Sequence, residues 1–335
     1  MRRPPIKFFF FLITILVACN TGKIKKQLTT PFLTAKDVVL FNQLVYKENI
    51  KDSFAKYTPG YDVVYLPKAI HGNYAIIAKN KTTDQYALVI RGTMIGFSNE
   101  GFQNFLQDFN IFTIKPWNYA NTVKEAYISK GTFIGFQNLI QLKDSATGLS
   151  LKEFIEKKIP VSASIVITGH SLGGNLAYPL AGYLKKELPA DKKNSLQLIT
   201  FAAPAAGNAA FVQDLEEKFP LAERYVIDKD IAPVFPDMDH IHELAKKIGL
   251  DSVLQINPVL NAGDLFNIAG KILEKTNIIN KTNKYVQSQK HLRILTTNDT
   301  VSSNIGLSVD AIFNRARRFH KIDSYAELLG GKAIN

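Results

Sequence analysis

Hydrophobic and polar residues alternate along this chain with two different periods, and together these predict a mixed α/β protein. Runs of β-forming residues predict strands at 63–65, 74–77, 86–90, 164–168, 196–201 and 224–227. The polar segment from Lys79 to Asp84 predicts a hairpin connection. Strands that alternate with helical stretches are typical of a parallel sheet with helices on its faces.

Helical periodicity fills most of the intervals between these strands. It predicts helices at about 34–49, 150–158, 175–188 and 208–219. The first two begin with helix-capping pairs, Thr34 with Asp37 and Ser150 with Glu153. Pro179 falls inside the third, where we expect it to remove a hydrogen bond and bend the helix.

The amino terminus has the pattern of a secretory signal. Three basic residues precede an apolar run from Phe8 to Ala18, which is shorter than the ~20 residues that a membrane-spanning helix needs. The run ends in Leu16-Val17-Ala18-Cys19, which resembles the lipobox of bacterial lipoproteins. The resemblance implies cleavage before Cys19 and acyl chains attached to it, which anchor a protein firmly to a membrane.

These features predict three parts of the chain. Residues 1–18 are the expected lipoprotein signal peptide, 19–34 a lipidated tether rich in lysine, and 35–335 the folded domain. The expected location is the bacterial cell envelope, with the protein held on a membrane by its lipid anchor and facing the periplasm or the cell surface.

Composition indicates a globular protein, since 46% of the 335 residues are hydrophobic and 21% are charged. The 41 basic and 29 acidic residues give a net charge of +12, which favours an anionic partner surface. The basic residues are dispersed, however, so we expect no nucleic-acid partner. The single cysteine, Cys19, excludes an internal disulfide and a cysteine-based zinc site. We expect no metal and no cofactor.

The fourth predicted strand runs into Gly169-His170-Ser171-Leu172-Gly173, a G-x-S-x-G motif followed by a helical pattern. A serine on so sharp a strand-to-helix turn needs neighbours without a Cβ, and Gly169 and Gly173 supply them. The turn projects the Ser171 hydroxyl outward. It also places the Leu172 N–H at a helix amino terminus, where it can stabilise an oxyanion. The motif therefore predicts Ser171 as a nucleophile.

Four further segments follow a recognisable order around this motif. They are Val89-Ile90-Arg91-Gly92-Thr93, Asn104-Phe105-Leu106-Gln107-Asp108, Thr200 to Phe211, and Arg224 to Pro233. In this order they resemble the class 3 lipases, the fungal-type α/β-hydrolases. The resemblance implies a mostly parallel central sheet flanked by helices, hydrolysis of carboxylic esters, and Thr93 as an oxyanion-hole donor.

The acid of a Ser-acid-His triad follows the serine along the chain in this fold. The resemblance implies Asp230, in Asp230-Ile231-Ala232-Pro233. Spacing alone also allows Asp228, because both carboxylates follow the end of the same predicted strand.

The base must be a histidine beyond the acid. His320, followed five residues later by Tyr325, resembles the family's histidine and is the expected base. His240 and His291 remain alternatives, although a solvated loop position is favoured for His291. His170 is expected to pack in the elbow, because it cannot turn back to the Oγ of its neighbour.

Two segments lie outside these motifs. Residues 94–103 are apolar and punctuated by glycine, at the position of the family's lid, and an ordinary packed loop is equally consistent. The long interval between Asp230 and His320 predicts a helical insertion at about 238–300, with helices around 243–248 and 264–273. Amphipathic helices packed on the core are favoured there over a membrane-facing surface.

The sequence thus predicts a serine ester hydrolase acting on acyl glycerols or related lipid esters. A phospholipase or lysophospholipase is an alternative that the positive charge favours. A catalytically inactive hydrolase fold that serves as an envelope binding protein is another, because a fold alone does not secure a function.

Overall fold

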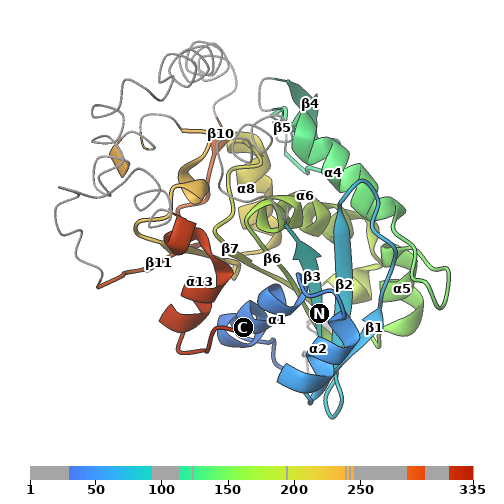
Figure 1. Cartoon of the computed structure of the whole chain (residues 1–335). Helices are drawn as coiled ribbons and strands as arrows, with labels where there is room; N and C mark the ends of the chain where they lie inside the picture. The colour runs from blue at the N-terminus through green and yellow to red at the C-terminus, as the bar shows by residue number, and fades with distance from the viewer. Residues whose placement is uncertain are drawn as a thin grey trace, which may run out of the picture.

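The structure is a computed structural model, and it describes residues 30–92, 110, 113–122, 124–193, 195–237, 240, 243–244, 285–298 and 317–334. Its centre is a seven-stranded sheet in the order β1-β2-β3-β6-β7-β9-β11 (Figure 1). These strands are β1 (Tyr61–Tyr65), β2 (Tyr74–Asn80), β3 (Gln85–Arg91), β6 (Ser164–His170), β7 (Leu196–Phe201), β9 (Glu223–Ile227) and β11 (Leu292–Leu295). The first three pair antiparallel and all later neighbours pair parallel. The prediction of a mostly parallel sheet is confirmed.

A second, smaller sheet has four short antiparallel strands in the order β10-β8-β5-β4. They are β4 (Ile114–Pro116), β5 (Tyr127–Ser129), β8 (Gly207–Asn208) and β10 (Tyr285–Val286). β8 directly precedes a helix, whose N-cap Asn208 accepts from the backbone N–H of Phe211.

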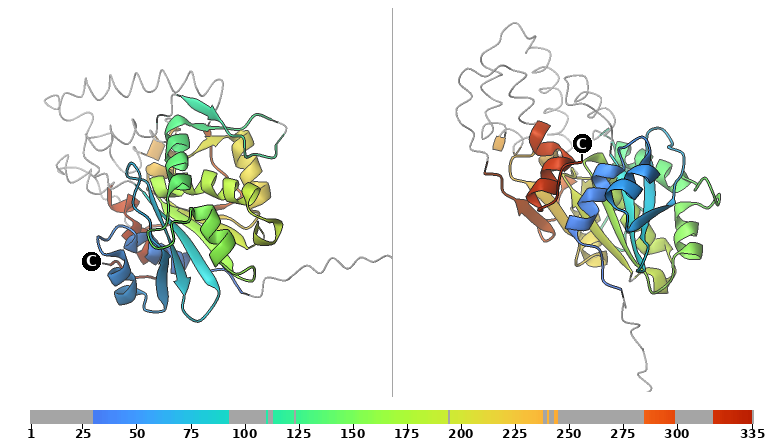
Figure 2. Two further views of the ribbon diagram at one scale, coloured as in Figure 1. Left: turned by 90° about the vertical axis from the view of Figure 1, so that its right-hand side faces the viewer. Right: turned by 60° about the horizontal axis from the view of Figure 1, so that its bottom comes forward.

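Helices cover both faces of the main sheet (Figure 2). One face packs against α4 (Lys130–Gln141), α5 (Leu151–Lys158), α6 (Leu172–Glu187) and α8 (Ala209–Lys218). The other packs against α1 (Ala35–Leu44), α2 (Ile50–Tyr57) and α13 (Ile322–Leu328). Two further short elements are α7 (Ala190–Lys193) and the 3-10 turn η1 (Ala232–Val234). β6 is buried along its whole length because both of its faces are covered.

Local sequence chemistry explains most of the helix boundaries. Ser150 and Glu153 form the predicted capping box of α5, and Thr34 and Asp37 form that of α1. The predicted first helix is too long, because α1 ends at Leu44 and α2 begins separately at Ile50. The chain turns between them, where the hydroxyl of Tyr46 accepts a hydrogen bond from Gly92 N–H.

The helix that follows Ser171 begins earlier than predicted and is not ended by proline. α6 runs from Leu172 to Glu187 with Pro179 buried inside it. Pro179 has no N–H for the helix ladder. The residue four positions earlier is the buried Asn175, whose side-chain carboxamide donates to the carbonyl of Ala205 and accepts from the hydroxyl of Thr132.

The region predicted as a helical insertion lies mostly outside the described residues. Its described carboxyl-terminal part contains two strands, β10 and β11, rather than helices. β11 extends the main sheet by pairing parallel with β9. His291, which precedes β11, is 6% exposed, so the expectation that it lies in a solvated loop is wrong.

The main sheet has a clear polarity. The backbone carbonyl of Pro31 accepts from Gln85 and Ser164, which are the first residues of β3 and β6. The chain therefore enters the domain at the amino-terminal edge of the parallel strands (Figure 2). Ser171 follows the last residue of β6, at the opposite edge. Within the described residues, no helix is long and apolar enough to cross a membrane.

Candidate active site

The predicted elbow forms between β6 and α6. Ser171 has φ 57° and ψ −126°, a strained conformation for a residue with a side chain. A Cβ on Gly169 would lie 2.3 Å from the carbonyl carbon of Gly173, and a Cβ on Gly173 would lie 2.2 Å from the carbonyl oxygen of Ile90. Neither position has room for any other residue, so both glycines are required for the turn, as predicted.

The three residues predicted for the triad meet at this elbow. Ser171 Oγ lies 2.9 Å from His320 Nε2, and His320 Nδ1 lies 3.0 Å from both carboxylate oxygens of Asp230. Asp230 is 1% exposed and His320 is 7% exposed. The fold thus brings together side chains that are 149 and 90 positions apart in the sequence.

The hydrogen positions follow from the partners. A carboxylate only accepts, so His320 Nδ1 carries the hydrogen and donates it to Asp230. In the neutral ring Nε2 is then an acceptor, and the Ser171 hydroxyl donates to it. The arrangement can withdraw a proton from a serine nucleophile and hold the imidazole in the tautomer that this transfer needs.

Asp230 is fixed by two more donors. Its Oδ1 accepts from the backbone N–H of Ala232 at 3.0 Å, and its Oδ2 accepts from the hydroxyl of Tyr325 at 2.7 Å. That hydroxyl also accepts from Ile227 N–H at 3.1 Å. Burial, together with the charge of Asp230, raises the pKa of Tyr325 well above 10, so it stays a donor. Sequence reasoning noted Tyr325 only as a spacing marker and missed this contact.

The alternatives to Asp230 and His320 lie elsewhere. Asp228 accepts from Thr297 N–H at 3.2 Å, beside β11. His240 is exposed and pairs with Asp237. His291 is buried beside Arg224, whose backbone N–H donates to its carbonyl.

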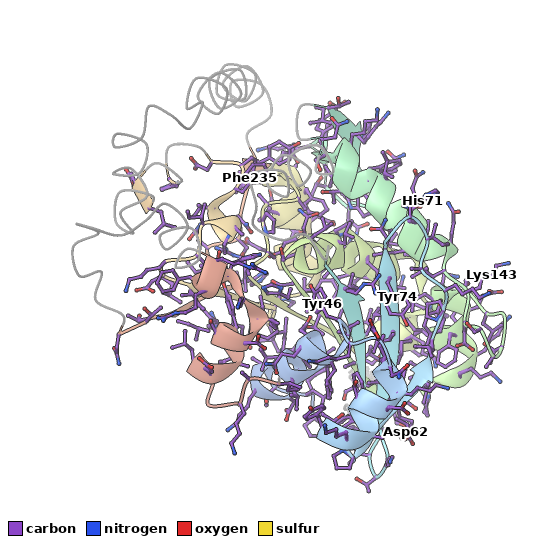
Figure 3. All side chains as sticks on the ribbon, viewed as in Figure 1. Tyr46, Asp62, His71, Tyr74, Lys143 and Phe235 are labelled. Carbon is purple, nitrogen blue, oxygen red and sulfur yellow. The ribbon has the colours of Figure 1, made fainter. Side chains whose placement is uncertain are left out.

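Of the residues expected at or beside the oxyanion hole, the structure describes Gly92 and Leu172. Gly92 N–H donates to the hydroxyl of Tyr46 at 3.0 Å, and a Cβ on Gly92 would lie 2.7 Å from the carbonyl oxygen of His170. Tyr46, in the turn between α1 and α2, is labelled in Figure 3. Burial raises the pKa of Tyr46 to about 12, so this phenol stays neutral. Leu172 is the first residue of α6, as expected. Thr93, the predicted lid at 94–103, the 104–108 motif and Cys19 lie outside the described residues.

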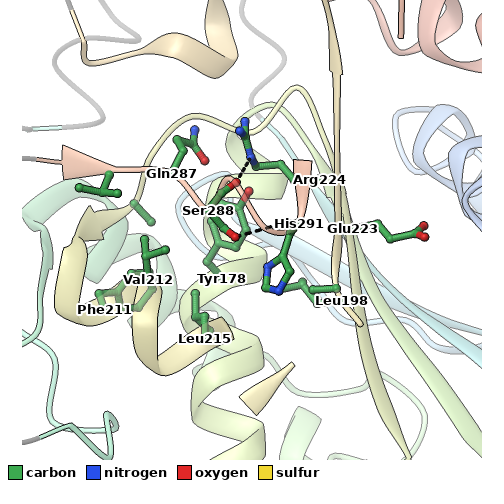
Figure 4. Close-up of a pocket in the computed structure, with 13 residues that line it drawn as sticks. Tyr178, Leu198, Phe211, Val212, Leu215, Glu223, Arg224, Gln287, Ser288 and His291 are labelled. Atoms are coloured by element: carbon green, nitrogen blue, oxygen red, sulfur yellow. Dashed lines mark hydrogen bonds between the residues drawn. The ribbon is translucent and has the colours of Figure 1, made fainter. Parts of the chain in front are cut away.

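A small cavity lies beside β9, at a distance from the triad. It has a volume of about 20 Å³, enough for roughly one water molecule, and its wall includes Tyr178, Arg224 and His291 (Figure 4). Arg224 Nε donates to the carbonyl of Ser288 at 3.3 Å. Neither Ser171 nor His320 lines this cavity, so it is not a substrate pocket of the elbow.

The strand order, the elbow and the position of the three residues define the α/β-hydrolase fold. A family model described as Lipase (class 3) matches residues 87–240. The crystal structure of M37 lipase matches with a TM-score of 0.67 and 23% identity, over 90% of this chain and 94% of that one. Lipase II from Rhizopus niveus (TM-score 0.45, 19% identity, 56% and 66% covered) and the Rhizomucor miehei triacylglyceride lipase (0.46, 20%, 62% and 77%) also match.

The family model covers residues 87–240, from β3 to the segment after η1, and the similarity to M37 lipase at 23% identity shows a shared fold.

Proposed function

We propose that this protein is a serine ester hydrolase that cleaves carboxylic esters of acyl glycerols or related lipids. The observation that carries the proposal is the continuous line of contacts from Asp230 through His320 to Ser171. The strained φ of Ser171 is a second support, because strain of this kind clusters at active sites.

In the proposed reaction, Ser171 Oγ attacks the ester carbonyl while His320 Nε2 takes the hydroxyl proton. His320 then returns this proton to the leaving alcohol, which leaves an acyl-enzyme on Ser171. Water, deprotonated by the same imidazole, attacks the acyl-enzyme, and the imidazolium gives its proton to the departing Ser171 Oγ, which releases the fatty acid and restores the free hydroxyl. Asp230 holds the imidazole and stabilises its charged form.

The oxyanion that forms in each step needs fixed donors. The Leu172 N–H is proposed as one of them, because it lies at the amino terminus of α6. Thr93 is proposed as the other, from its position directly after Gly92. Gly92 itself packs closely against the elbow, since a Cβ on it would lie 2.7 Å from the carbonyl oxygen of His170.

We further propose that Cys19 is acylated and that the protein works on a membrane of the bacterial cell envelope. The support is the sequence from Arg2 to Cys19, with its basic start, apolar run and Leu-Val-Ala-Cys ending.

Hydrolysis of p-nitrophenyl esters from acetate to palmitate by the detergent-purified full chain tests the catalytic proposal. Turnover is expected, and Ser171→Ala and His320→Ala should each abolish it. The matched controls Ser162→Ala and His240→Ala alter exposed residues and should retain it. Ser171-independent turnover, or no turnover by a folded protein, would overturn the proposal, and the latter would favour a binding protein. A preference for phospholipid over acyl glycerol vesicles would identify a phospholipase.

A further inference from the structure

The side chain of His170, the residue before Ser171, is not used in the proposed reaction. Its Nε2 lies 2.7 Å from the backbone carbonyl oxygen of His320. The two imidazole rings are 4.9 Å apart, at an angle of 39°. His170 is 7% exposed, so it is enclosed between the elbow and the segment that carries the proposed base.

The protonation of His170 follows from this contact. A carbonyl oxygen only accepts, so Nε2 carries the hydrogen and donates it. Burial lowers the pKa of His170 well below 6.5, and the neighbouring His320 acts in the same direction. The ring centre of Tyr325 is 6.0 Å from that of His170, and Tyr325 stays neutral because its own pKa is raised. The Asp230 carboxylate is bonded to Nδ1 of His320. His170 is therefore a neutral donor.

This neutral donor acts on the proposed base in two ways. It ties the backbone of His320 to the end of β6, while Asp230 holds the other side of the imidazole. His320 gains a positive charge when it takes the serine proton. A charged His170 at 4.9 Å would oppose that charge, and the neutral ring does not.

We propose that His170 is a positioning residue for His320, which it holds in reach of Ser171 through the Nε2–H···O hydrogen bond. The inference rests on the proposed function, because it needs His320 as the base. It assigns His170 a role in addition to packing in the elbow.

Two substitutions separate the hydrogen bond from the ring. His170→Gln keeps an N–H near the position of Nε2 but removes the ring, whereas His170→Phe keeps a ring and removes the donor. The same two substitutions at the exposed His240 are the matched controls. We would measure kcat and KM for p-nitrophenyl butyrate with the detergent-purified full chain, together with the thermal midpoint of each variant.

The expected result is a kcat for His170→Phe about 10- to 100-fold below that of the wild type, with KM unchanged, because the base is misplaced without loss of ester binding. His170→Gln should recover most of this loss, and the His240 variants should show none. A role in packing alone predicts the reverse order, with Gln worse than Phe and kcat following the thermal midpoint, and that result would overturn the inference. Undiminished kcat in both His170 variants would also overturn it.

The failure of the proposed function would look different. If His320→Ala kept full activity, His320 would not be the base and the inference would fall together with the proposal. If His320→Ala abolished turnover while His170→Phe preserved it, only the role of His170 would be wrong.

Discussion

At the scale of single residues, the elbow requires glycine, because a Cβ would overlap neighbouring backbone atoms. Gly173 lies so close to the end of β3 that a Cβ would overlap both the carbonyl of Ile90 and the N–H of Gly92. The same helix contains Gly182, where a Cβ would make ordinary contacts at 3.5 Å or more. The two positions provide a matched pair within α6.

Gly173→Ala should lower the free energy of unfolding by at least about 3 kcal/mol and abolish esterase activity, because backbone atoms on β3 must move. Gly182→Ala should raise it by about 0.5–1 kcal/mol, since alanine restricts the unfolded chain. Urea denaturation followed by circular dichroism measures both. Equal stabilities for the two variants would contradict this account of the elbow.

Tyr325 provides a second test at this scale. Tyr325→Phe removes the donor to Asp230 and leaves the buried Ile227 N–H without its acceptor. We expect a loss of stability of about 1–3 kcal/mol and a fall in kcat of about tenfold. The pKa of Tyr325 is well above 10, so deprotonation of its hydroxyl should cause no loss of wild-type activity up to about pH 10.

The control is Tyr178→Phe, which removes another tyrosine hydroxyl in the same interior, 3.2 Å from Thr200 Oγ1. It should lower stability with little effect on kcat. If both variants lost activity equally, the contact with Asp230 would have no special role.

At the scale of elements, a buried ion pair joins α8 to the segment before β5. Lys218 Nζ lies 2.6 Å from Asp214 Oδ2 and donates to the carbonyl of Tyr119 at the same distance. Asp214 in turn accepts from Asn121 N–H at 2.7 Å. Both charged side chains are almost fully enclosed, and burial lowers the pKa of Lys218.

Lys218→Met should therefore destabilise the fold by about 3–5 kcal/mol, because it leaves the Asp214 charge buried and unpaired. The double variant Asp214→Leu with Lys218→Met should lose less than the sum of the two single variants. Denaturant unfolding of the three variants gives the coupling energy. Strict additivity would show that the pair is not coupled.

At the scale of the whole molecule, the amino-terminal chain and the candidate site lie at opposite edges of the parallel strands. Pro31 is bonded to the first residues of β3 and β6, whereas Ser171 follows the last residue of β6. At about 3.3 Å per residue, the seven residues of β6 separate the two edges by roughly 20 Å. The described chain therefore begins roughly 20 Å from the edge that carries Ser171.

Cys19→Ser should move the protein from the membrane to the soluble fraction in a bacterial host, because the proposed acylation needs the thiol. Its kcat on a dissolved short-chain ester should stay within about twofold of the wild type, since Cys19 precedes the predicted folded domain and takes no part in the proposed reaction. Fractionation and p-nitrophenyl butyrate hydrolysis measure the two effects. Membrane retention of the variant would argue against the anchor.

The sequence by itself determined the parts of this protein that depend on neighbouring residues. The strands β1, β2, β3, β6, β7 and β9, the hairpin after β2, the α5 capping box and the strand-serine-helix elbow each follow from local spacing and local sterics. The motif order also selected Asp230 over Asp228 and His320 over His240 and His291, and the three selected side chains lie together in the fold.

Only the tertiary structure decided the features that join distant segments. β11 carries no distinctive local pattern and becomes a strand because β9 offers it an unpaired edge. The break between α1 and α2 places Tyr46 against Gly92, a contact that no short window of sequence contains. The contacts of His170 and Tyr325 around His320 arise in the same way, because they exist only once the carboxyl-terminal segment has packed against the end of the sheet.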